Sequence, residues 1–100
     1  MHFLLIYDLA DDYLQRRQDF RAAHLELAWN AKETLGLVLA GALDEPVDQA
    51  ILLFECDNPD RLEFFAKADP YVKNGLVKSW RVRPWHTVVG DAAVTPTRVA

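Results

Sequence analysis

The sequence predicts a single α+β domain in which two helices cover one face of a four-stranded antiparallel sheet. Three observations lead to this fold class. One hundred residues suffice for one hydrophobic core and not for two. Hydrophobic residues make up 51% of the chain, which is typical of a globular protein and excludes disorder. Strand and helix patterns follow one another in the order strand, helix, strand, strand, helix, strand.

The first two elements are a strand over residues 2–8 and a long helix over residues 12–35. The strand is rich in aromatic and aliphatic residues. The helical segment contains no proline or glycine, and Asp11 and Asp12 place negative charge where a helix N-terminus stabilises it. Gly36 is a natural stop after this helix. Residues that follow one another at spacings of three or four form a stripe along one face of this helix. They are Tyr13, Arg17, Phe20, His24, Leu27, Ala31 and Leu35.

The middle of the chain is predicted to form two strands, over residues 37–43 and 50–56. Asp44-Glu45-Pro46 is the turn between them. Asn58-Pro59 then combines an N-cap residue with a proline at the first helical position, so a second helix is expected to run to about Ala68.

The last part of the chain begins with Asp69-Pro70, a second start signal, which predicts a short helical turn ended by Gly75. A fourth strand follows over residues 77–85. The remaining residues carry little pattern, so we expect one domain over residues 1–89 and a C-terminal tail over residues 90–100.

With right-handed crossovers, this order of elements gives the ferredoxin-like βαββαβ arrangement, with both helices on one face of the sheet. The first three strands are apolar on both faces, whereas only the fourth alternates apolar and polar residues. Two helices can cover one face, so something else must cover the other. A second copy of the same sheet is the simplest cover, which predicts a homodimer with sheets packed face to face.

Composition and motifs exclude several classes of function. The formal charge is −4 and the basic residues are scattered, so nucleic acid is not expected as a partner. The N-terminus lacks a basic segment and a long apolar run, so neither a signal peptide nor a membrane partner is expected. The single cysteine, Cys56, fits a reducing compartment and a cytoplasmic location. Isolated glycines and the absence of paired cysteines or His-x-x-x-His indicate no cofactor and no metal.

His24 is the first candidate for chemistry, because it lies on the apolar stripe of the long helix. A core histidine satisfied by one hydrogen bond is one interpretation. The other is a general base in a cleft, where partial burial keeps the imidazole neutral. Arg21 lies one turn earlier and could hold an anionic group beside it, although it could also be a solvated helix arginine.

Asp69 and Tyr71 are the further candidates. Asp69 can cap the short turn that starts at Pro70, and it can orient His24 and stabilise its protonated form. Tyr71 can supply a hydroxyl to the same cleft or can simply pack. The sequence does not show whether His24 and Asp69 meet.

Several segments together make the chain resemble the YCII-related (YciI-like) proteins. They are Arg21-Ala22-Ala23-His24-Leu25, Ala40-Gly41, Ala68-Asp69-Pro70-Tyr71 followed by Gly75-Leu76, and Val82-Arg83-Pro84-Trp85. The resemblance covers residues 1–87, and it implies a dimeric α+β barrel. It also implies that His24 and Asp69 form the active-site pair. The short link over residues 44–49 departs from the longer, glycine-containing stretch of many members.

The resemblance implies little about the substrate, since one branch of the family is associated with dehydrochlorination of chlorinated hydroxyquinones. Two hypotheses of function follow. The first is a cofactor-independent enzyme of lyase or isomerase type, in which His24 and Asp69 abstract a proton from a small aromatic or enolic molecule. Arg21 and Tyr71 would bind the substrate. The second is a non-catalytic dimeric module that binds a small ligand or another protein.

Overall fold

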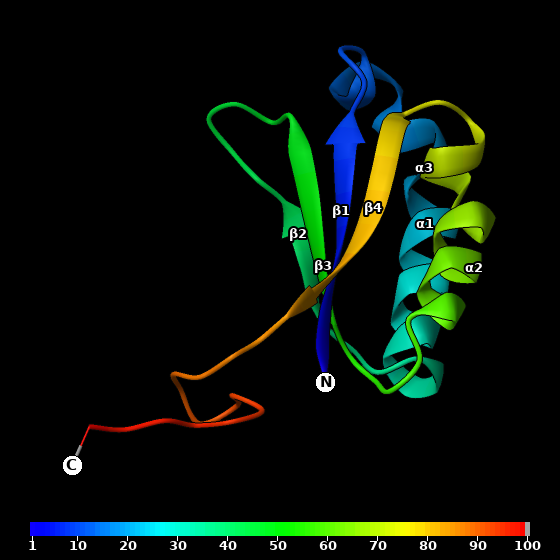
Figure 1. The fold of residues 1–100 in the computed structure, drawn as a ribbon. Coiled ribbons are helices and arrows are strands. Elements are labelled where there is room, and N and C mark those ends of the chain that lie inside the picture. The colour runs from blue at the N-terminus through cyan, green and yellow to red at the C-terminus, as the bar shows by residue number, and fades with distance from the viewer. Residues whose placement is uncertain (100) are drawn as a thin grey trace.

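The computed structural model describes residues 1–99 and has the predicted α+β fold (Figure 1). One short third helix is added where the sequence predicts a helical turn. The elements are β1 (His2–Leu9), α1 (Tyr13–Thr34), β2 (Leu37–Ala42), β3 (Gln49–Glu55), α2 (Asp60–Ala68), α3 (Pro70–Lys73) and β4 (Val77–Trp85).

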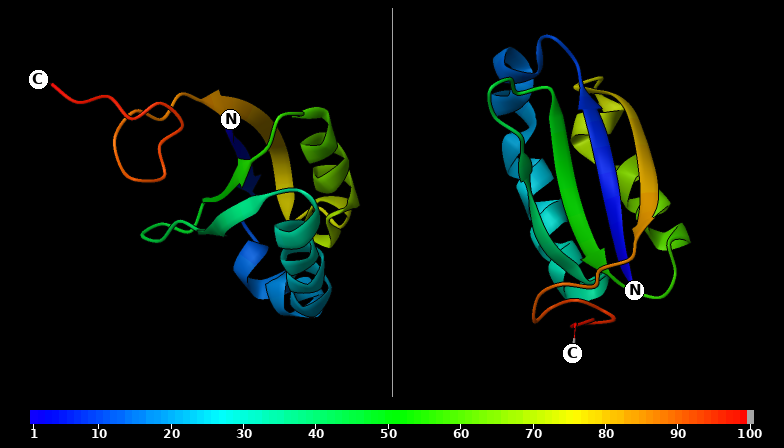
Figure 2. Two further views of the ribbon diagram at one scale, coloured as in Figure 1. Left: turned by 90° about the horizontal axis from the view of Figure 1, so that it is seen from below. Right: turned by 60° about the vertical axis from the view of Figure 1, so that its left-hand side comes forward.

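The sheet has the strand order β2-β3-β1-β4, and every neighbouring pair is antiparallel. This order confirms the ferredoxin-like arrangement. All three helices lie on one side of the sheet, as two further views show (Figure 2). The two strands that lead into the helices, β1 and β3, are therefore the central strands.

The observed boundaries of helices and strands differ from the predicted ones by at most one residue. Helix α2 is assigned from Asp60, although Pro59 already has helical dihedral angles and the Asn58 side chain accepts the N–H of Asp60 at 2.9 Å. Asp12 precedes α1 but makes no capping hydrogen bond, and its carboxylate instead lies 3.7 Å from Arg16. Gly36 follows α1 with φ +78°, as a helix-ending glycine requires.

The hydrophobic core lies between the sheet and the helices. Strand β1 turns Phe3, Leu5, Tyr7 and Leu9 towards the helices, and all four are buried. Neighbouring β3 contributes its own buried residues to the same layer, namely Ala50, Leu52 and Phe54. Tyr7 thus places a hydroxyl group inside an otherwise apolar layer.

The opposite face of the sheet has no helix over it (Figure 1). Leu4, Ile6, Ile51 and Leu53 point to this face and are half-buried, while Leu39 on the edge strand β2 is 71% exposed. This apolar surface is the one that the sequence assigns to a second subunit. The homodimer stays a prediction, because a single chain is described.

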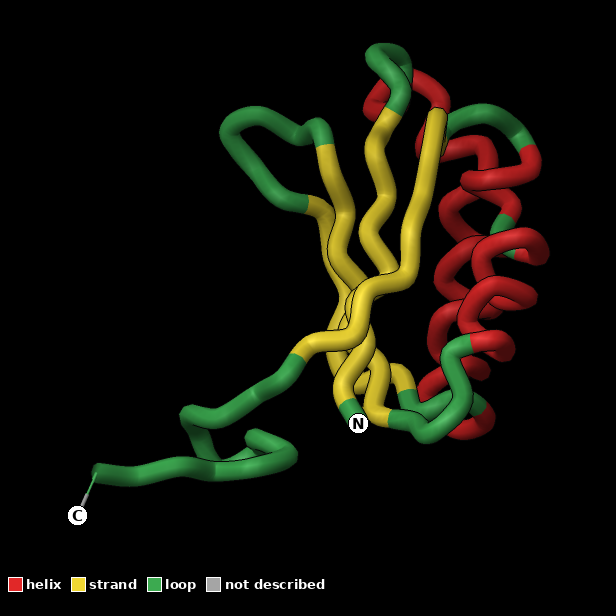
Figure 3. Tube along the Cα trace, in the orientation of Figure 1, coloured by secondary structure: helices red, strands yellow, loops and turns green. Residues whose placement is uncertain are grey.

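Residues 86–99 contain no helix or strand and extend away from the sheet (Figure 3). Thr87 anchors their start, since its hydroxyl lies 2.7 Å from Nδ1 of His2. The Thr95 N–H donates to the Thr87 carbonyl and the Thr97 N–H to that of Val88, which folds the segment back on itself. The division into a domain over 1–89 and a tail over 90–100 stays a prediction, and Ala100 lies outside the described residues.

Over residues 1–99, none of the helices combines the length and the apolar character that crossing a membrane requires.

Candidate active site

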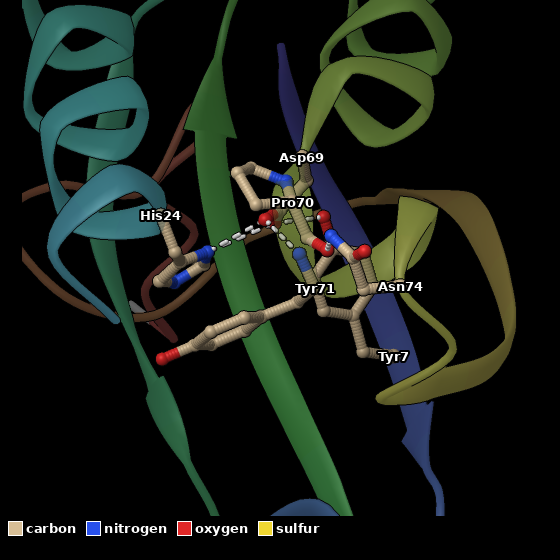
Figure 4. Close-up of polar contacts among 6 residues, drawn as sticks. All are labelled: Tyr7, His24, Asp69, Pro70, Tyr71 and Asn74. Atoms are coloured by element: carbon tan, nitrogen blue, oxygen red, sulfur yellow. Dashed lines mark hydrogen bonds and ion pairs between the residues drawn. The ribbon is translucent and has the colours of Figure 1, made fainter. Parts of the chain in front are cut away.

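The fold brings His24 and Asp69 together, although 45 residues separate them in the chain. His24 lies in the middle of α1, and Asp69 lies between α2 and α3. Nδ1 of His24 lies 2.8 Å from Oδ1 and 3.0 Å from Oδ2 of Asp69 (Figure 4). The sequence allowed this contact without requiring it, and the structure contains it.

Asp69 is completely buried, and its carboxylate accepts hydrogen bonds from three groups. Besides the His24 ring, these are the Tyr7 hydroxyl at 2.7 Å and the Tyr71 backbone N–H at 3.0 Å. The Tyr71 bond makes Asp69 the N-cap of α3, so capping and the histidine contact coexist in one side chain. A buried carboxylate is tolerated where its oxygens are satisfied in this way.

Tyr7 is a site residue that the sequence analysis missed. Burial, and after it the nearby Asp69 carboxylate, hold the pKa of Tyr7 well above its usual value. Its hydroxyl therefore stays protonated and donates to Asp69 at every physiological pH. A tyrosine at a core-facing position of β1, among Phe3, Leu5 and Leu9, is the sequence signal that could have identified it.

The imidazole of His24 is oriented by its hydrogen bond to Asp69 and by stacking on the Tyr71 ring, with ring centroids 3.9 Å apart. The side chain of His24 is 16% exposed. Because the Asp69 carboxylate is an acceptor, the neutral form of the imidazole carries its hydrogen on Nδ1 and its lone pair on Nε2. Within residues 1–99, Nε2 has no hydrogen-bond partner. The arrangement leaves a free proton acceptor at the edge of a cleft.

A cavity of about 390 Å³ lies between α1 and the edge strand β2. His24, Arg21 and Tyr71 line it on the helix side, which places three of the four predicted site residues in one cavity. The other wall is mostly apolar and is formed by residues 37–42 of β2 together with Ala50 and Leu52. Asp69 is the fourth predicted residue and lies behind His24.

The hydroxyl of Tyr71 is buried and has no hydrogen-bond partner among the described residues. Burial, followed by the nearby Tyr13, raises the pKa of Tyr71 to about 12, so the hydroxyl is neutral at physiological pH. A buried donor without a partner is uncommon in native proteins. Tyr71 also lines the cavity.

Arg17 is a second residue that the sequence analysis did not assign to the site. It lines the cavity together with Arg21, and its guanidinium group lies 5.7 Å from the centroid of the Tyr13 ring. Its place on the stripe of α1 was visible in the sequence, but the cleft that it borders was not.

No group of three or more His, Cys, Asp or Glu side chains that could hold a metal ion occurs in residues 1–99. The expectation that the site needs neither metal nor cofactor stays a prediction.

Fold and site together define a small α+β protein with a histidine–carboxylate pair at the wall of an apolar cleft. The chain belongs to the YCII-related domain family, whose model matches residues 1–86. This match confirms the resemblance that the sequence motifs indicate.

Solved structures similar to this chain include 5-chloro-2-hydroxyhydroquinone dehydrochlorinase from Burkholderia phenoliruptrix, in complex with 2,5-dihydroxybenzoquinone. The TM-score is 0.73 and the sequence identity is 26%, over 87% of this chain and 95% of that one. Among curated proteins, no match is found.

Proposed function

We propose that the protein is a cofactor-independent enzyme of lyase or isomerase type that acts on a small aromatic or enolic molecule. The observation that carries this proposal is the hydrogen bond between His24 and the buried Asp69, with Nε2 of His24 left free beside a cavity. A histidine oriented by a carboxylate in this way is suited to general acid–base catalysis.

In the proposed reaction, Nε2 of His24 removes a proton from a carbon of the substrate. The imidazolium that forms keeps its Nδ1–H bond to Asp69, whose negative charge stabilises it. In an elimination, which for a chlorinated hydroquinone proceeds from the diketo tautomer, the electrons of the broken C–H bond form a carbon–carbon double bond and chloride departs with its own electron pair. In an isomerisation, the proton returns to another carbon.

Arg21 and Tyr71 are the proposed substrate-binding residues, because both line the cavity next to His24. The neutral hydroxyl of Tyr71 can donate to an oxygen on which negative charge develops, and the Arg21 guanidinium adds positive charge near it. Both groups are therefore placed to stabilise negative charge on a substrate oxygen during the reaction.

Dehydrochlorination is the reaction by which we propose to test the site first. The structural neighbour catalyses it on 5-chloro-2-hydroxyhydroquinone, and its solved complex holds a flat dihydroxyquinone. The cleft of this chain, with an apolar wall and stacked rings, is suited to a flat molecule of similar size.

The test is chloride release from 5-chloro-2-hydroxyhydroquinone by the purified protein. We expect His24→Gln to lower the rate by about 10²- to 10⁴-fold, because it removes the general base. His86→Gln is the matched control, since His86 is exposed and lies outside the cavity lining.

The alternative is a non-catalytic module that binds a small ligand, and the apolar wall of the cavity favours it. Wild-type protein that binds 2,5-dihydroxybenzoquinone without releasing chloride from the chlorinated substrate supports this alternative. Turnover that His24→Gln leaves unchanged contradicts the proposed mechanism.

We also propose that the protein acts as a homodimer through the open face of its sheet. The support is the apolar surface formed by Leu4, Ile6, Leu39, Ile51 and Leu53. Light scattering should give twice the 11.4 kDa mass of one chain, and Ile6→Lys should give the monomer. A monomeric wild-type protein at micromolar concentration contradicts the dimer.

A further inference from the structure

We infer that the substrate enters this site as an anion, with its ionised oxygen bound by Arg17, Arg21 and the hydroxyl of Tyr71. The ligand class is a flat, small molecule that carries a phenolate or enolate oxygen. This inference deepens the proposed function and rests on it for the position of the base, His24.

The charge of the cavity differs in sign from the charge of the chain. The whole chain has a formal charge of −4. The cavity lining, by contrast, contains Arg17, Arg21 and Lys32 and no aspartate or glutamate. A low-dielectric cleft lined by one sign of charge concentrates ions of the opposite sign. The lining of this cavity is therefore suited to attract an anion, although the chain as a whole carries a negative formal charge.

Arg17 and Arg21 are not neutralised by the protein itself. Their neighbour Arg16 lies 3.7 Å from the Asp12 carboxylate and donates to the carbonyl of Asn74 at 2.7 Å. For Arg17 and Arg21, no carboxylate lies within 4 Å in residues 1–99. Unpaired guanidinium groups in a cleft are suited to bind an anionic oxygen, since they present planar arrays of donors.

The two arginines share one face of α1 with the catalytic histidine. Arg17 precedes Arg21 by four residues and Arg21 precedes His24 by three, which corresponds to about 6 Å and about 4.5 Å along the helix axis. A guanidinium group on this face can therefore contact one end of a small ring while Nε2 of His24 contacts another. Lys32 lies eight residues beyond His24, about 12 Å along the axis, and is too far to share that oxygen.

Arg17 is connected to the Tyr71 ring through the Tyr13 ring, which contacts both. Arg17 packs over Tyr13, and the Tyr13 ring meets the Tyr71 ring edge-on with centroids 5.6 Å apart. Both Arg21 and Arg17 lower the pKa of Tyr71, against the larger effect of burial, so both positive charges act at this hydroxyl. The hydroxyl remains a neutral donor and lacks a partner in the described part of the chain.

The shape of the site favours a flat ring over a compact anion. The Tyr71 ring lies parallel to the His24 ring within 8° (Figure 4). The opposite wall of the cavity is formed by β2 and is mostly apolar. Donor groups and an apolar wall thus line the same cavity. An ionised oxygen attached to a flat conjugated ring satisfies both parts, because its charge reaches the donors while its ring contacts the apolar wall.

The test uses 4-nitrophenol, whose ionised form is yellow and is populated near neutral pH, and 4-nitroanisole, a neutral ether of similar shape. We expect the wild-type protein to bind the nitrophenolate at least tenfold more tightly than the ether. Bound probe should therefore become yellow at a lower pH than free probe. Arg17→Gln and Arg21→Gln should each weaken nitrophenolate binding by about tenfold and leave binding of the ether unchanged.

Lys32→Gln is the matched control, because it removes the same charge from the same cavity at a distance from the proposed oxygen site. It should change nitrophenolate affinity less than twofold, and circular dichroism should show that each variant is folded. Equal affinity for the two probes overturns the inference. So does an effect of Lys32→Gln as large as that of Arg17→Gln, since that result indicates general attraction rather than a subsite.

The result separates this inference from the proposed function, because binding of the probe requires no turnover. His24→Gln should retain the preference for nitrophenolate while losing chloride release. Retained preference without any His24-dependent turnover contradicts the proposed function alone. Turnover that depends on His24, without a preference for the anion, contradicts this inference alone.

Discussion

The imidazole of His24 stacks on the phenol ring of Tyr71, with ring centroids 3.9 Å apart and ring planes 8° from parallel. Asp69 connects the same two residues, because its carboxylate accepts hydrogen bonds from the His24 ring and from the backbone N–H of Tyr71. The imidazole, the carboxylate and the phenol are thus in mutual contact between α1 and α3. Tyr7 on β1 adds a further contact, since its hydroxyl donates a hydrogen bond to the Asp69 carboxylate.

Loss of the hydroxyl group should affect the stability of the protein differently at the two buried tyrosines, Tyr7 and Tyr71. Tyr7→Phe removes a hydrogen bond to a buried carboxylate, and we expect it to lower the free energy of unfolding by about 1.5–3 kcal/mol. Tyr71→Phe removes a buried hydroxyl that has no partner within residues 1–99, so its stability should stay within about 0.5 kcal/mol of the wild type or rise. Urea denaturation measures both changes.

The reverse order, with Tyr71→Phe the more destabilising variant, contradicts this description of the site. It would mean that the Tyr71 hydroxyl has a partner in the folded protein. Each variant is the control for the other, because both remove one oxygen from a buried phenol ring and keep its shape.

Asp8 should make the stability of the protein depend on pH in acid. Hydrogen bonds from Gln49 and Ser79, followed by Arg81, hold the pKa of Asp8 below its usual value. A lowered pKa in the folded state means that the unfolded chain binds the proton first as pH falls. The stabilisation is therefore present above the unfolded pKa of about 3.9 and is lost as pH falls through the folded value.

Asp8→Asn tests this dependence. The variant should be less stable than the wild type at neutral pH, and the difference should shrink once the pH falls below about 4. Thermal unfolding at a series of pH values measures it. Asp91→Asn, in the C-terminal segment, is the control and should follow the wild-type curve at every pH. A difference between Asp8→Asn and the wild type that is constant with pH argues against the mechanism.

The fold was predictable because its signals are local. Short segments rich in apolar residues, a long segment free of proline and glycine, and two start signals at Asn58-Pro59 and Asp69-Pro70 appear in the sequence itself. Boundaries were less certain, because whether an end residue such as Leu9 pairs depends on hydrogen bonds from other strands.

The site was only partly predictable, for a related reason. His24 and Asp69 are visible as a histidine on an apolar stripe and a carboxylate at a start signal. Tyr7 was missed because its partner lies 62 residues away, and nothing near it in the sequence shows a need for a donor. Arg17 was missed because an arginine on a helix is usually solvated, and only the folded chain shows that it borders the cavity.

Gly36, which directly precedes β2, and Gly41, which lies within it, should differ strongly in their tolerance of alanine. Gly36 has φ +78°, and a Cβ atom there would collide with the carbonyl oxygen of Glu55. Gly36→Ala should therefore lower the free energy of unfolding by more than about 1 kcal/mol. Gly41 has a negative or extended φ and no atom within 4 Å of such a Cβ, so Gly41→Ala should be close to neutral for stability.

Urea denaturation of the two variants measures this difference. Because Gly41 lines the cavity, Gly41→Ala adds a methyl group near the site while leaving the fold intact. Equal destabilisation by the two substitutions would show that Gly36 is not packed against the Glu55 carbonyl as described.

Asp69→Asn should separate the proposed catalytic role of the carboxylate from its structural role. Asparagine is as good an N-cap as aspartate, so the start of α3 should be retained. The negative charge that stabilises the His24 imidazolium is lost, and the amide can present its NH₂ group to the ring. We therefore expect kcat for chloride release to fall by about 10²- to 10⁴-fold with little change in KM.

The matched control is Asp60→Asn, which removes one carboxylate from the exposed first turn of α2. It should leave kcat unchanged. If Asp69→Asn raises KM and leaves kcat intact, Asp69 acts on binding rather than on the charged histidine. If it unfolds the protein, loss of the Tyr7 and His24 contacts outweighs the retained cap, and Asp69 is then chiefly a structural residue.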